Sequence, residues 1–316
     1  MLIVDTDRIA DTLDYPRLVE ALREGHRRGV DAVERVLMSQ ATSATQLNHL
    51  TVLPAWRHGE AIGTKLVTVF PGNAPPTPSI QTVYVLFDGR DGTPLACITG
   101  STFTLRKTAA DSALGASFLA RADATELLMV GAGNQARHQI AALCTVRPAI
   151  RRVAIWNRSG GKAHELARSL DLGVAAAATD DLEAAARRAD IICCATSATA
   201  PLIRGAWLKP GTHVDLVGGF TNDMREADDA TIARGSLFVD SRWFTAGLCG
   251  DITGPIASGV ITEADIKADL FQLCSGLHPG RRHAEEITVF KNAGGGHLDL
   301  MVAQLVHQLA TAGKLG

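Results

Sequence analysis

The spacing of apolar positions changes along the chain and predicts two regions of different architecture. In the first region, Asp14 precedes a helical pattern that places Leu18, Val19 and Leu22 on one face and ends near Gly29. Strand-like runs follow at 51–53, 65–70, 83–87 and 95–98. One helix with several short strands is typical of an α+β domain.

Beyond about residue 105, buried strand patterns alternate with helical patterns, which predicts right-handed crossovers and a parallel sheet. Strands are expected at 127–130, 153–156, 191–194, 213–217 and 237–240, helices at 108–121, 134–143, 162–170 and 181–188, and a last helix at about 298–312. We therefore expect an α/β protein with two domains. The first is an α+β domain over 1–112 that includes the C-terminal helical segment 298–316, and the second is a Rossmann-type, doubly wound domain over 113–297.

Composition and charge narrow the range of partners. The 316 residues include 31 Lys and Arg against 33 Asp and Glu, and only 5% of them are aromatic. This near-balance of charge argues against nucleic acid or an acidic membrane surface, both of which favour a basic excess. Hydrophobic residues make up 46% of the chain, enough for two sizeable cores. A globular protein that acts on a small molecule is the expectation.

Cysteine spacing and the N-terminal residues indicate the cellular compartment. The six cysteines contain no Cys-x-x-Cys pair, and the ten histidines show no metal-ligand spacing, so neither a disulfide framework nor a metal site is predicted. The chain opens without a basic, apolar secretory leader, and no run approaches the roughly 18 apolar residues that span a bilayer. A cytoplasmic protein is expected.

A glycine-rich turn directly after the strand at 127–130 predicts dinucleotide binding. It reads Gly131-Ala132-Gly133-Asn134-Gln135-Ala136 and opens a helix, whose backbone N–H groups and dipole can hold a pyrophosphate. Gly131 permits the tight turn, Gly133 lets phosphate approach, and Ala136 allows close helix-to-strand packing. The alternative is a glycine-rich turn without a ligand.

The end of the next strand indicates which dinucleotide is bound. An NAD site usually has Asp or Glu there, whereas this chain has Asn157-Arg158-Ser159, with Lys162 nearby. These side chains can donate hydrogen bonds to a 2′-phosphate, and Arg158 adds positive charge. NADPH is therefore expected, with NADH as a weaker alternative. A solvated basic turn is the competing interpretation.

Basic residues of the first domain are candidates for binding an anionic substrate. Lys65 lies on an otherwise apolar strand, where burial is costly unless the ammonium meets a cavity or a counter-ion. Arg35, Lys107 and the neighbouring Arg106 are further candidates. Taken singly, each of these residues is more readily interpreted as a surface charge than as a ligand.

With these motifs in place, the chain resembles the ornithine cyclodeaminase and mu-crystallin family over nearly its whole length. The resemblance rests on the segments Gly63–Pro71, Thr108–Leu114, Val130–Ala136, Ile155–Arg158 and Phe290–Gly295. It implies a homodimer whose first domain provides substrate binding and dimer contacts. By position, Lys65 resembles the lysine that meets the substrate carboxylate, and Arg35 resembles the preceding arginine. Lys107 stands where many members have arginine, with Arg106 as a substitute.

One departure from the family pattern indicates the reaction. After Gly218 and Gly219, where ornithine cyclodeaminases carry an acid–base aspartate, this chain has Phe220, which cannot transfer a proton. That position, followed by Met224-Arg225-Glu226, is similar to the bacterial branch that reduces cyclic ketimines. The resemblance implies NADPH-dependent reduction of Δ1-pyrroline-2-carboxylate to L-proline, and of Δ1-piperideine-2-carboxylate to L-pipecolate, as in trans-3-hydroxy-L-proline degradation. Phe220 would contact the ring of the cyclic imino acid.

Roles can also be predicted for the proton donor and for the residues that line the cofactor. Lys65 or a bound water would keep the imine nitrogen protonated, since a protonated imine accepts hydride more readily. Open-chain imine reduction or amino-acid dehydrogenation, a cyclodeaminase, and a binding protein that holds NADPH without turnover remain alternatives. Thr196, Ser197, Val217, Gly218 and Gly294 are expected to line the cofactor, and Asp299 and His297 to support its nicotinamide end. A structural histidine is the alternative interpretation of His297.

Overall fold

The computed structural model describes residues 1–31, 33–43, 46–219, 221–245, 247 and 249–314. The chain divides into two compact units, Met1–Lys107 with Gly295–Gly316 and Thr108–Gly294. The sequence analysis places these divisions at 112/113 and 297/298. The first division falls inside one continuous helix, α2 (Ser101–Leu119), which begins seven residues before the helix expected from residue 108.

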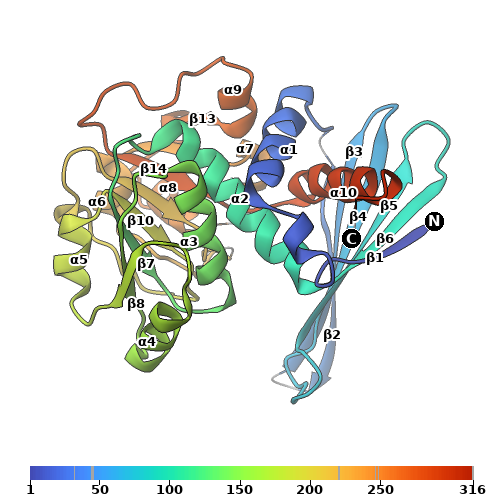
Figure 1. Ribbon diagram of the computed structural model, residues 1–316, viewed down its shortest axis with the longest axis horizontal. Helices are drawn as coiled ribbons and strands as arrows, with labels where there is room; N and C mark the ends of the chain where they lie inside the picture. Colours follow the sequence, from blue (N-terminus) through green and yellow to red (C-terminus); the bar gives the residue numbers. More distant parts are fainter. Residues whose placement is uncertain (32, 44–45, 220, 246, 248, 315–316) are drawn as a thin grey trace. The chain divides into compact units, whose positions relative to one another are not determined.

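The first unit is a mixed sheet covered by a helix that comes from the far end of the chain. The strand order is β1-β6-β5-β4-β3-β2, with β1 parallel to β6 and the other neighbours antiparallel. Helix α10 (Gly296–Thr311), red in Figure 1, packs on β3, β4 and β5, and α1 (Tyr15–Arg28) packs on α10. The strands are β1 (Leu2–Asp5), β2 (Val36–Ser43), β3 (Gln46–Arg57), β4 (Ala61–Val69), β5 (Ile80–Asp88) and β6 (Pro94–Thr99), and a short 3-10 helix, η1, spans Ala10–Thr12.

Helix α1 begins and ends as its sequence predicts. The Asp14 side chain caps it by accepting a hydrogen bond from the Arg17 N–H, and Gly29 ends it at a φ of 76°. Leu18 and Leu22 on its apolar face are fully buried. The expected strand at 51–53 is part of the longer β3. The one at 65–70 runs one residue past β4, which begins earlier, at Ala61, and ends at Val69. Polar residues on the exposed face of each strand interrupt the apolar pattern that predicts its length.

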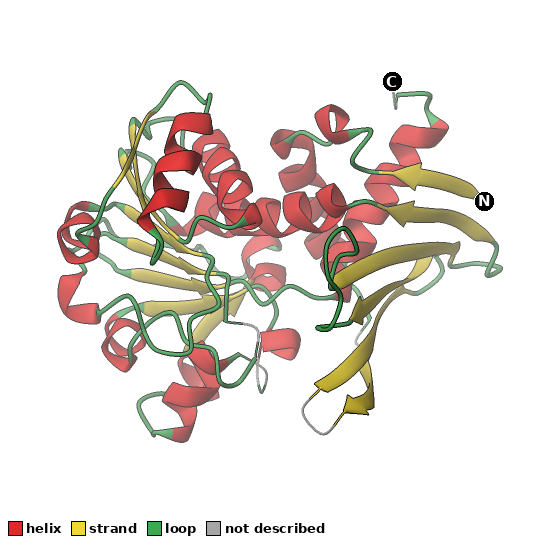
Figure 2. Ribbon diagram, turned by 90° about the horizontal axis from the view of Figure 1, so that it is seen from below, coloured by secondary structure: helices red, strands yellow, loops and turns green. Residues whose placement is uncertain are grey.

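The second unit is a doubly wound parallel sheet, which confirms the expected fold class. The strand order is β13-β12-β14-β11-β10-β7-β8-β9, and the order reverses beside β7. Helices cover both faces of this sheet (Figure 2). Its strands are β7 (Glu126–Val130), β8 (Arg152–Trp156), β9 (Ala175–Ala178), β10 (Ile191–Cys194), β11 (His213–Leu216), β12 (Ser236–Val239), β13 (Ile266–Asp269) and β14 (Thr288–Lys291). Its helices after α2 are α3 (Asn134–Val146), α4 (Gly160–Ser169), α5 (Leu182–Arg188), α6 (Asp229–Arg234), α7 (Arg242–Thr245), α8 (Gly250–Ala257) and α9 (Leu270–Cys274), with 3-10 helices η2 (Gly205–Trp207) and η3 (Glu263–Asp265).

Two apolar cores lie against the two faces of this sheet. Along β7, Leu127 and Met129 belong to one core, whereas Leu128 and Val130 belong to the other. A strand buried on both faces has no polar alternation, which is why these strands read as unbroken apolar runs in the sequence. No helix in the described ranges is long and apolar enough to cross a bilayer.

Candidate active site

The turn after β7 has the geometry of a phosphate-binding loop. Gly131 adopts a φ of +107°, and a Cβ there would lie 2.5 Å from the carbonyl oxygen of Ala195. A Cβ on Gly133, in contrast, would meet nothing within 4 Å, so the space above this residue is open. Gly131 is therefore required by the fold, whereas Gly133 leaves room for a ligand to approach the backbone.

The start of α3 offers uncapped amides to that space. Gly133 is the N-cap residue and has no side chain to accept hydrogen bonds from the first turn, which begins at Asn134 and Gln135. Ala136 is fully buried against the sheet, as close helix packing requires. Backbone amides at the positive end of a helix fit the pyrophosphate of a dinucleotide.

A pocket of about 350 Å³ lies beside this turn, at the carboxyl ends of β7, β8 and β10. The Asn157 side chain forms part of its wall and ties two loops together, accepting from the Ala132 N–H at 3.2 Å and donating to the Ser159 carbonyl at 3.0 Å. Arg158 is exposed at the pocket. The lining residues are Gly131, Ala132, Gly133, Trp156, Asn157, Arg158, Ser159, Lys162, Ala195, Thr196, Ser197, Ala198 and Leu202.

The charge of this lining favours an anion. It contains Arg158 and Lys162 and, among the residues that the structure describes, no carboxylate. No described acidic side chain pairs with Arg158. The position that would hold the ribose-binding acid of an NAD site is thus occupied by groups that can donate to a phosphate.

Hydrogen bonds to two carboxylates hold three further predicted cofactor residues, Thr196, Gly218 and Gly294. Glu226 accepts from the Thr196 N–H at 2.7 Å and from the Gly218 N–H at 2.7 Å, while the Val217 N–H donates to the Cys194 carbonyl. The Gly294 N–H donates to Asp240 at 2.6 Å. The sequence analysis quotes Glu226 within a family motif without giving it a role, and it does not identify Asp240.

In the first unit, two lysines bind opposite oxygens of one buried carboxylate. Asp299, in the first turn of α10, lies 2.9 Å from the Lys65 Nζ through one oxygen and 3.4 Å from the Lys107 Nζ through the other. The Asp299 side chain is completely buried, and both lysines are nearly so. Two ammonium groups around one carboxylate leave a net positive charge, which suits an anionic substrate.

Burial shapes the acid–base properties of this cluster. It lowers the pKa of Lys65 from its ordinary value, an effect that Lys107 reinforces and the nearby Asp299 opposes. Tyr84, opposite Lys65 on β5, has a pKa raised well above its ordinary value by burial and by Asp299. A lysine with a lowered pKa exchanges protons more readily near neutral pH and is a suitable donor to an imine nitrogen.

The other predicted substrate residues lie elsewhere or in other contacts. Arg106 donates to the Leu13 carbonyl at 2.7 Å, and its guanidinium lies 5.5 Å from the centre of the Tyr15 ring. Arg35 is exposed just before β2, and no described contact joins it to Lys65. Phe220 lies outside the described residues.

His297 belongs to the interior of the first unit. Its ring centre lies 5.6 Å from that of His26 in an edge-to-face arrangement, and burial lowers the pKa of His297 well below its ordinary value. This arrangement favours a neutral, structural histidine over a charged ligand.

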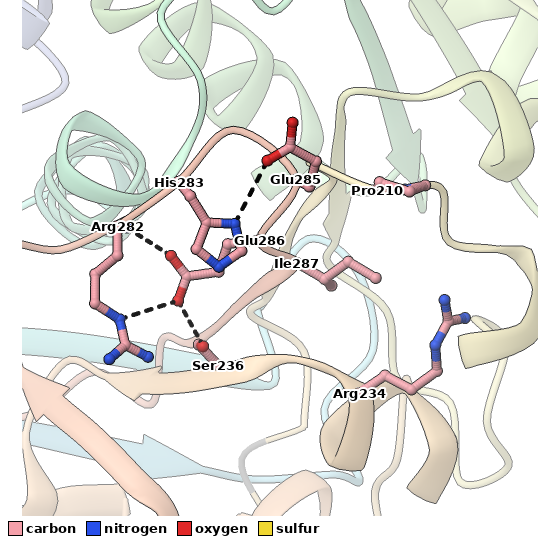
Figure 3. A pocket seen from close by; sticks show the side chains of 8 residues that line it. All are labelled: Pro210, Arg234, Ser236, Arg282, His283, Glu285, Glu286 and Ile287. Carbon is pink, nitrogen blue, oxygen red and sulfur yellow. Dashed lines mark hydrogen bonds and ion pairs between the residues drawn. The ribbon is translucent and has the colours of Figure 1, made fainter.

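A second pocket, of about 440 Å³, lies at the amino ends of β12 and β14 and thus at the opposite edge of the parallel sheet (Figure 3). Glu286 dominates it, accepting from the Ser236 hydroxyl and from the Arg282 N–H, each at 2.6 Å. Its carboxylate is already satisfied, and ligands of such sheets bind at the carboxyl ends of the strands. The glycine-turn pocket is therefore the better candidate.

Known proteins resemble the chain over almost its whole length. The profile of the ornithine cyclodeaminase/mu-crystallin family matches residues 5–314. A Δ1-pyrroline-2-carboxylate reductase of Paracoccus denitrificans is 46% identical over 300 residues, which span 93% of this chain and 92% of the relative. The Thermococcus litoralis Δ1-pyrroline-2-carboxylate reductase, solved with NADH and L-proline, superposes with a TM-score of 0.90 at 28% identity, covering 99% of this chain and 98% of its own. An archaeal alanine dehydrogenase dimer with bound NAD gives a TM-score of 0.89 at 26% identity, covering 100% of this chain and 98% of its own.

Proposed function

Because the chain belongs to the ornithine cyclodeaminase/mu-crystallin family, we propose that it is a ketimine reductase that converts Δ1-pyrroline-2-carboxylate to L-proline with a reduced nicotinamide dinucleotide. The observation that carries this proposal is the 46% identity, over 93% of the chain, to a reductase of that name. Δ1-Piperideine-2-carboxylate, which has the same imine and carboxylate on a larger ring, is the second proposed substrate. The reduced nicotinamide supplies the hydride that the imine carbon accepts.

The glycine-turn pocket is the proposed cofactor site. The backbone of Gly131, Gly133 and the first turn of α3 binds the pyrophosphate, since the Gly133 N-cap has no side chain and the space beside it is open. Arg158 pairs with a 2′-phosphate, with Ser159 and Lys162 beside it, and this makes NADPH the preferred cofactor over NADH. Thr196 lines the same pocket, and Asn157 fixes the shape of its wall.

The lysine cluster is the proposed substrate site. Lys65 and Lys107 bind the substrate carboxylate, because each ammonium group has three donors and forms one ion pair among the described residues, with Asp299. Lys65 also keeps a proton on the imine nitrogen, so that the hydride arriving at C2 and the proton on nitrogen together complete the saturated amine. Asp299 positions the two ammonium groups and prevents their mutual repulsion from separating them. Arg106 and Arg35 take no step in this mechanism.

We further propose a homodimer that acts in the cytoplasm. Strand β2 ends the sheet of the first unit, and Val36, Leu37 and Met38 on it are each about half exposed. An apolar edge strand is a ready surface for pairing with a second copy. The alanine dehydrogenase of similar fold is a dimer.

A substrate panel tests the proposed reaction. NADPH oxidation is followed with Δ1-pyrroline-2-carboxylate, with Δ1-piperideine-2-carboxylate, and with pyruvate plus ammonia, for the wild type and for Lys65→Met. The proposal is supported if NADPH is oxidised rapidly with the cyclic imines alone. The rate should fall about 100-fold in Lys65→Met, because the substrate carboxylate loses a buried charged partner. Turnover only with pyruvate plus ammonia would make the chain an open-chain imine reductase. NADPH binding without turnover of any of these substrates would make it a binding protein.

A further inference from the structure

Three of the charged side chains that are buried in the second unit interact with one another. Glu226, Asp251 and Lys291 are each 0% exposed, and the Lys291 Nζ lies 3.3 Å from an oxygen of Asp251. Burial opposes the charge of Lys291, yet Asp251 and Glu226 raise its pKa above the ordinary value. The lysine therefore stays cationic and balances part of the negative charge of the two carboxylates.

The Glu226 carboxylate joins two loops that leave neighbouring strands. One oxygen accepts from the Thr196 N–H at 2.7 Å and from the Thr196 hydroxyl at 2.8 Å, just after β10. The other oxygen accepts from the Gly218 N–H at 2.7 Å, just after β11. Both oxygens thus bind backbone at the carboxyl edge of the sheet, and Thr196 is itself a wall of the pocket.

The backbone around Glu226 leaves no room for adjustment. Asp251 accepts from the N–H groups of Glu226 and Ala227, at 2.8 and 3.2 Å, and so fixes the segment that carries the carboxylate. A Cβ on Gly218 would lie 2.4 Å from a Glu226 oxygen, and a Cβ on Gly219 would lie 2.4 Å from an Asp251 oxygen. The two consecutive glycines let the loop lie directly on the two carboxylates.

We infer that Glu226 is a positioning residue of the cofactor site, whose carboxylate sets the spacing of the loops at Thr196 and Gly218, while Asp251 fixes the backbone that carries this carboxylate and Lys291 supplies a compensating positive charge. This inference rests on the proposed function, because it assigns the loops to cofactor binding. A buried charge network that only stabilised the core would have no reason to direct both Glu226 oxygens to backbone at the carboxyl edge of the sheet, where Thr196 lines the pocket.

Glu226→Gln isolates this role at almost constant shape. Each carboxylate oxygen accepts a backbone N–H, one from Thr196 and the other from Gly218. Whichever way the glutamine amide is turned, its NH₂ group therefore faces one of these two N–H donors and that hydrogen bond is lost. Losing one hydrogen bond to a charged acceptor weakens NADPH binding by about tenfold. Glu226→Asp keeps the charge beside Lys291 and is the second variant, expected to show a smaller change in the same direction.

Glu286→Gln is the matched control. Glu286 is also buried and also accepts through both oxygens, but at the opposite edge of the sheet (Figure 3). NADPH affinity is measured by the fluorescence of bound cofactor, and amide hydrogen exchange is measured in peptides containing Thr196 and Gly218. We expect Glu226→Gln and Glu226→Asp to weaken NADPH binding and to raise exchange in both peptides, while Glu286→Gln leaves both readouts as in the wild type.

Two different results would separate failure of this inference from failure of the proposed function. Unchanged NADPH affinity and unchanged exchange in Glu226→Gln and Glu226→Asp, or equal losses in Glu286→Gln, would overturn the positioning role. Absence of NADPH and NADH binding by the wild type would overturn the proposed function and, with it, the assignment of Glu226 to a cofactor site. Hydrogen exchange in that case would report whether Glu226 joins the two loops.

Discussion

Lys65, Lys107 and Asp299 form the residue-scale centre of the proposed chemistry. Burying two cations is costly, and one buried carboxylate between them offsets part of that cost without neutralising the pair. The remaining positive charge is what an incoming carboxylate would satisfy. The same burial that makes the cluster attractive to an anion lowers the pKa of Lys65, so binding and proton supply arise from one arrangement.

Asp299→Asn should change the pH dependence of the reaction. If cationic Lys65 binds substrate, kcat/KM falls as pH rises through the Lys65 pKa, which burial already places below the ordinary 10.5. Asp299 raises that pKa, so its neutralisation moves the fall to lower pH. The check is a pH profile of kcat/KM for the wild type and the variant. An alkaline limb at the same pH in both proteins would contradict a role for Asp299 in setting the charge of Lys65.

Arg158→Gln should alter cofactor choice without altering the fold. The side chain is exposed, and no described carboxylate pairs with it, so its removal costs the protein little. We expect KM for NADPH to rise about tenfold and KM for NADH to stay constant, because only NADPH carries the phosphate that Arg158 would bind. Arg187→Gln, an exposed arginine paired with Glu183 on α5, serves as the control and should change neither KM. Equal losses for both cofactors in Arg158→Gln would exclude the 2′-phosphate role.

At the scale of elements, the two glycines of the turn between β7 and α3 have different roles: Gly131 is required for folding, and Gly133 leaves space for the ligand. Gly131→Ala would place a methyl group 2.5 Å from the Ala195 carbonyl at a positive φ, which costs on the order of 1–2 kcal/mol or more of folding stability. We expect a lower Tm as well as weaker cofactor binding, measured by thermal unfolding and by NADPH fluorescence.

Gly133→Ala is the complementary change in the same turn. Its Cβ meets nothing within 4 Å and its φ is −83°, which alanine adopts freely. The variant should therefore keep the wild-type Tm while binding NADPH more weakly, because the methyl group occupies the space proposed for the phosphate. Wild-type affinity in Gly133→Ala would place the phosphate elsewhere.

The elements also show which parts of the structure can be predicted from the sequence alone. Strands such as β7 and β10 are predicted because burial on both faces gives unbroken apolar runs. The four alanines of β9 and the sequence Ile-Lys-Ala-Asp of β13 give no strand pattern, since neighbouring strands rather than propensity stabilise them. The fully buried Lys291 at the end of β14 likewise reads as polar in the sequence.

Site residues were predictable where one turn or strand end carries them. Gly131, Gly133 and Arg158 fall in a local motif whose spacing predicts dinucleotide binding. The contact of Lys65 with Asp299 joins strand β4 to helix α10 from the far end of the chain, so spacing could not reveal it. The family resemblance singled out Lys65 for the substrate carboxylate, whereas Asp299 was expected at the nicotinamide end. Glu226 lies in a quoted motif, but its role depends on two distant loops meeting one carboxylate.

At the scale of the whole molecule, the proposed homodimer depends on the edge strand β2. Leu37→Glu places a charge on this exposed apolar strand and should convert a dimer of two 33.4 kDa chains into a monomer. Ile3→Glu is the control, because Ile3 is exposed on β1 at the other edge of the same sheet. Sedimentation velocity distinguishes the species. A wild-type protein that sediments as a monomer, or a Leu37→Glu variant that stays dimeric, would contradict this placement of the interface.

Hydride transfer to a cyclic imine is the central claim, and the fate of a deuterium label tests it most directly. NADPH carrying deuterium at both C4 positions is incubated with Δ1-pyrroline-2-carboxylate and the wild-type protein, and the product is analysed by mass spectrometry, NMR and chiral chromatography. We predict L-proline with one deuterium at C2. Proline without deuterium at C2, or no proline despite bound NADPH, would contradict the account.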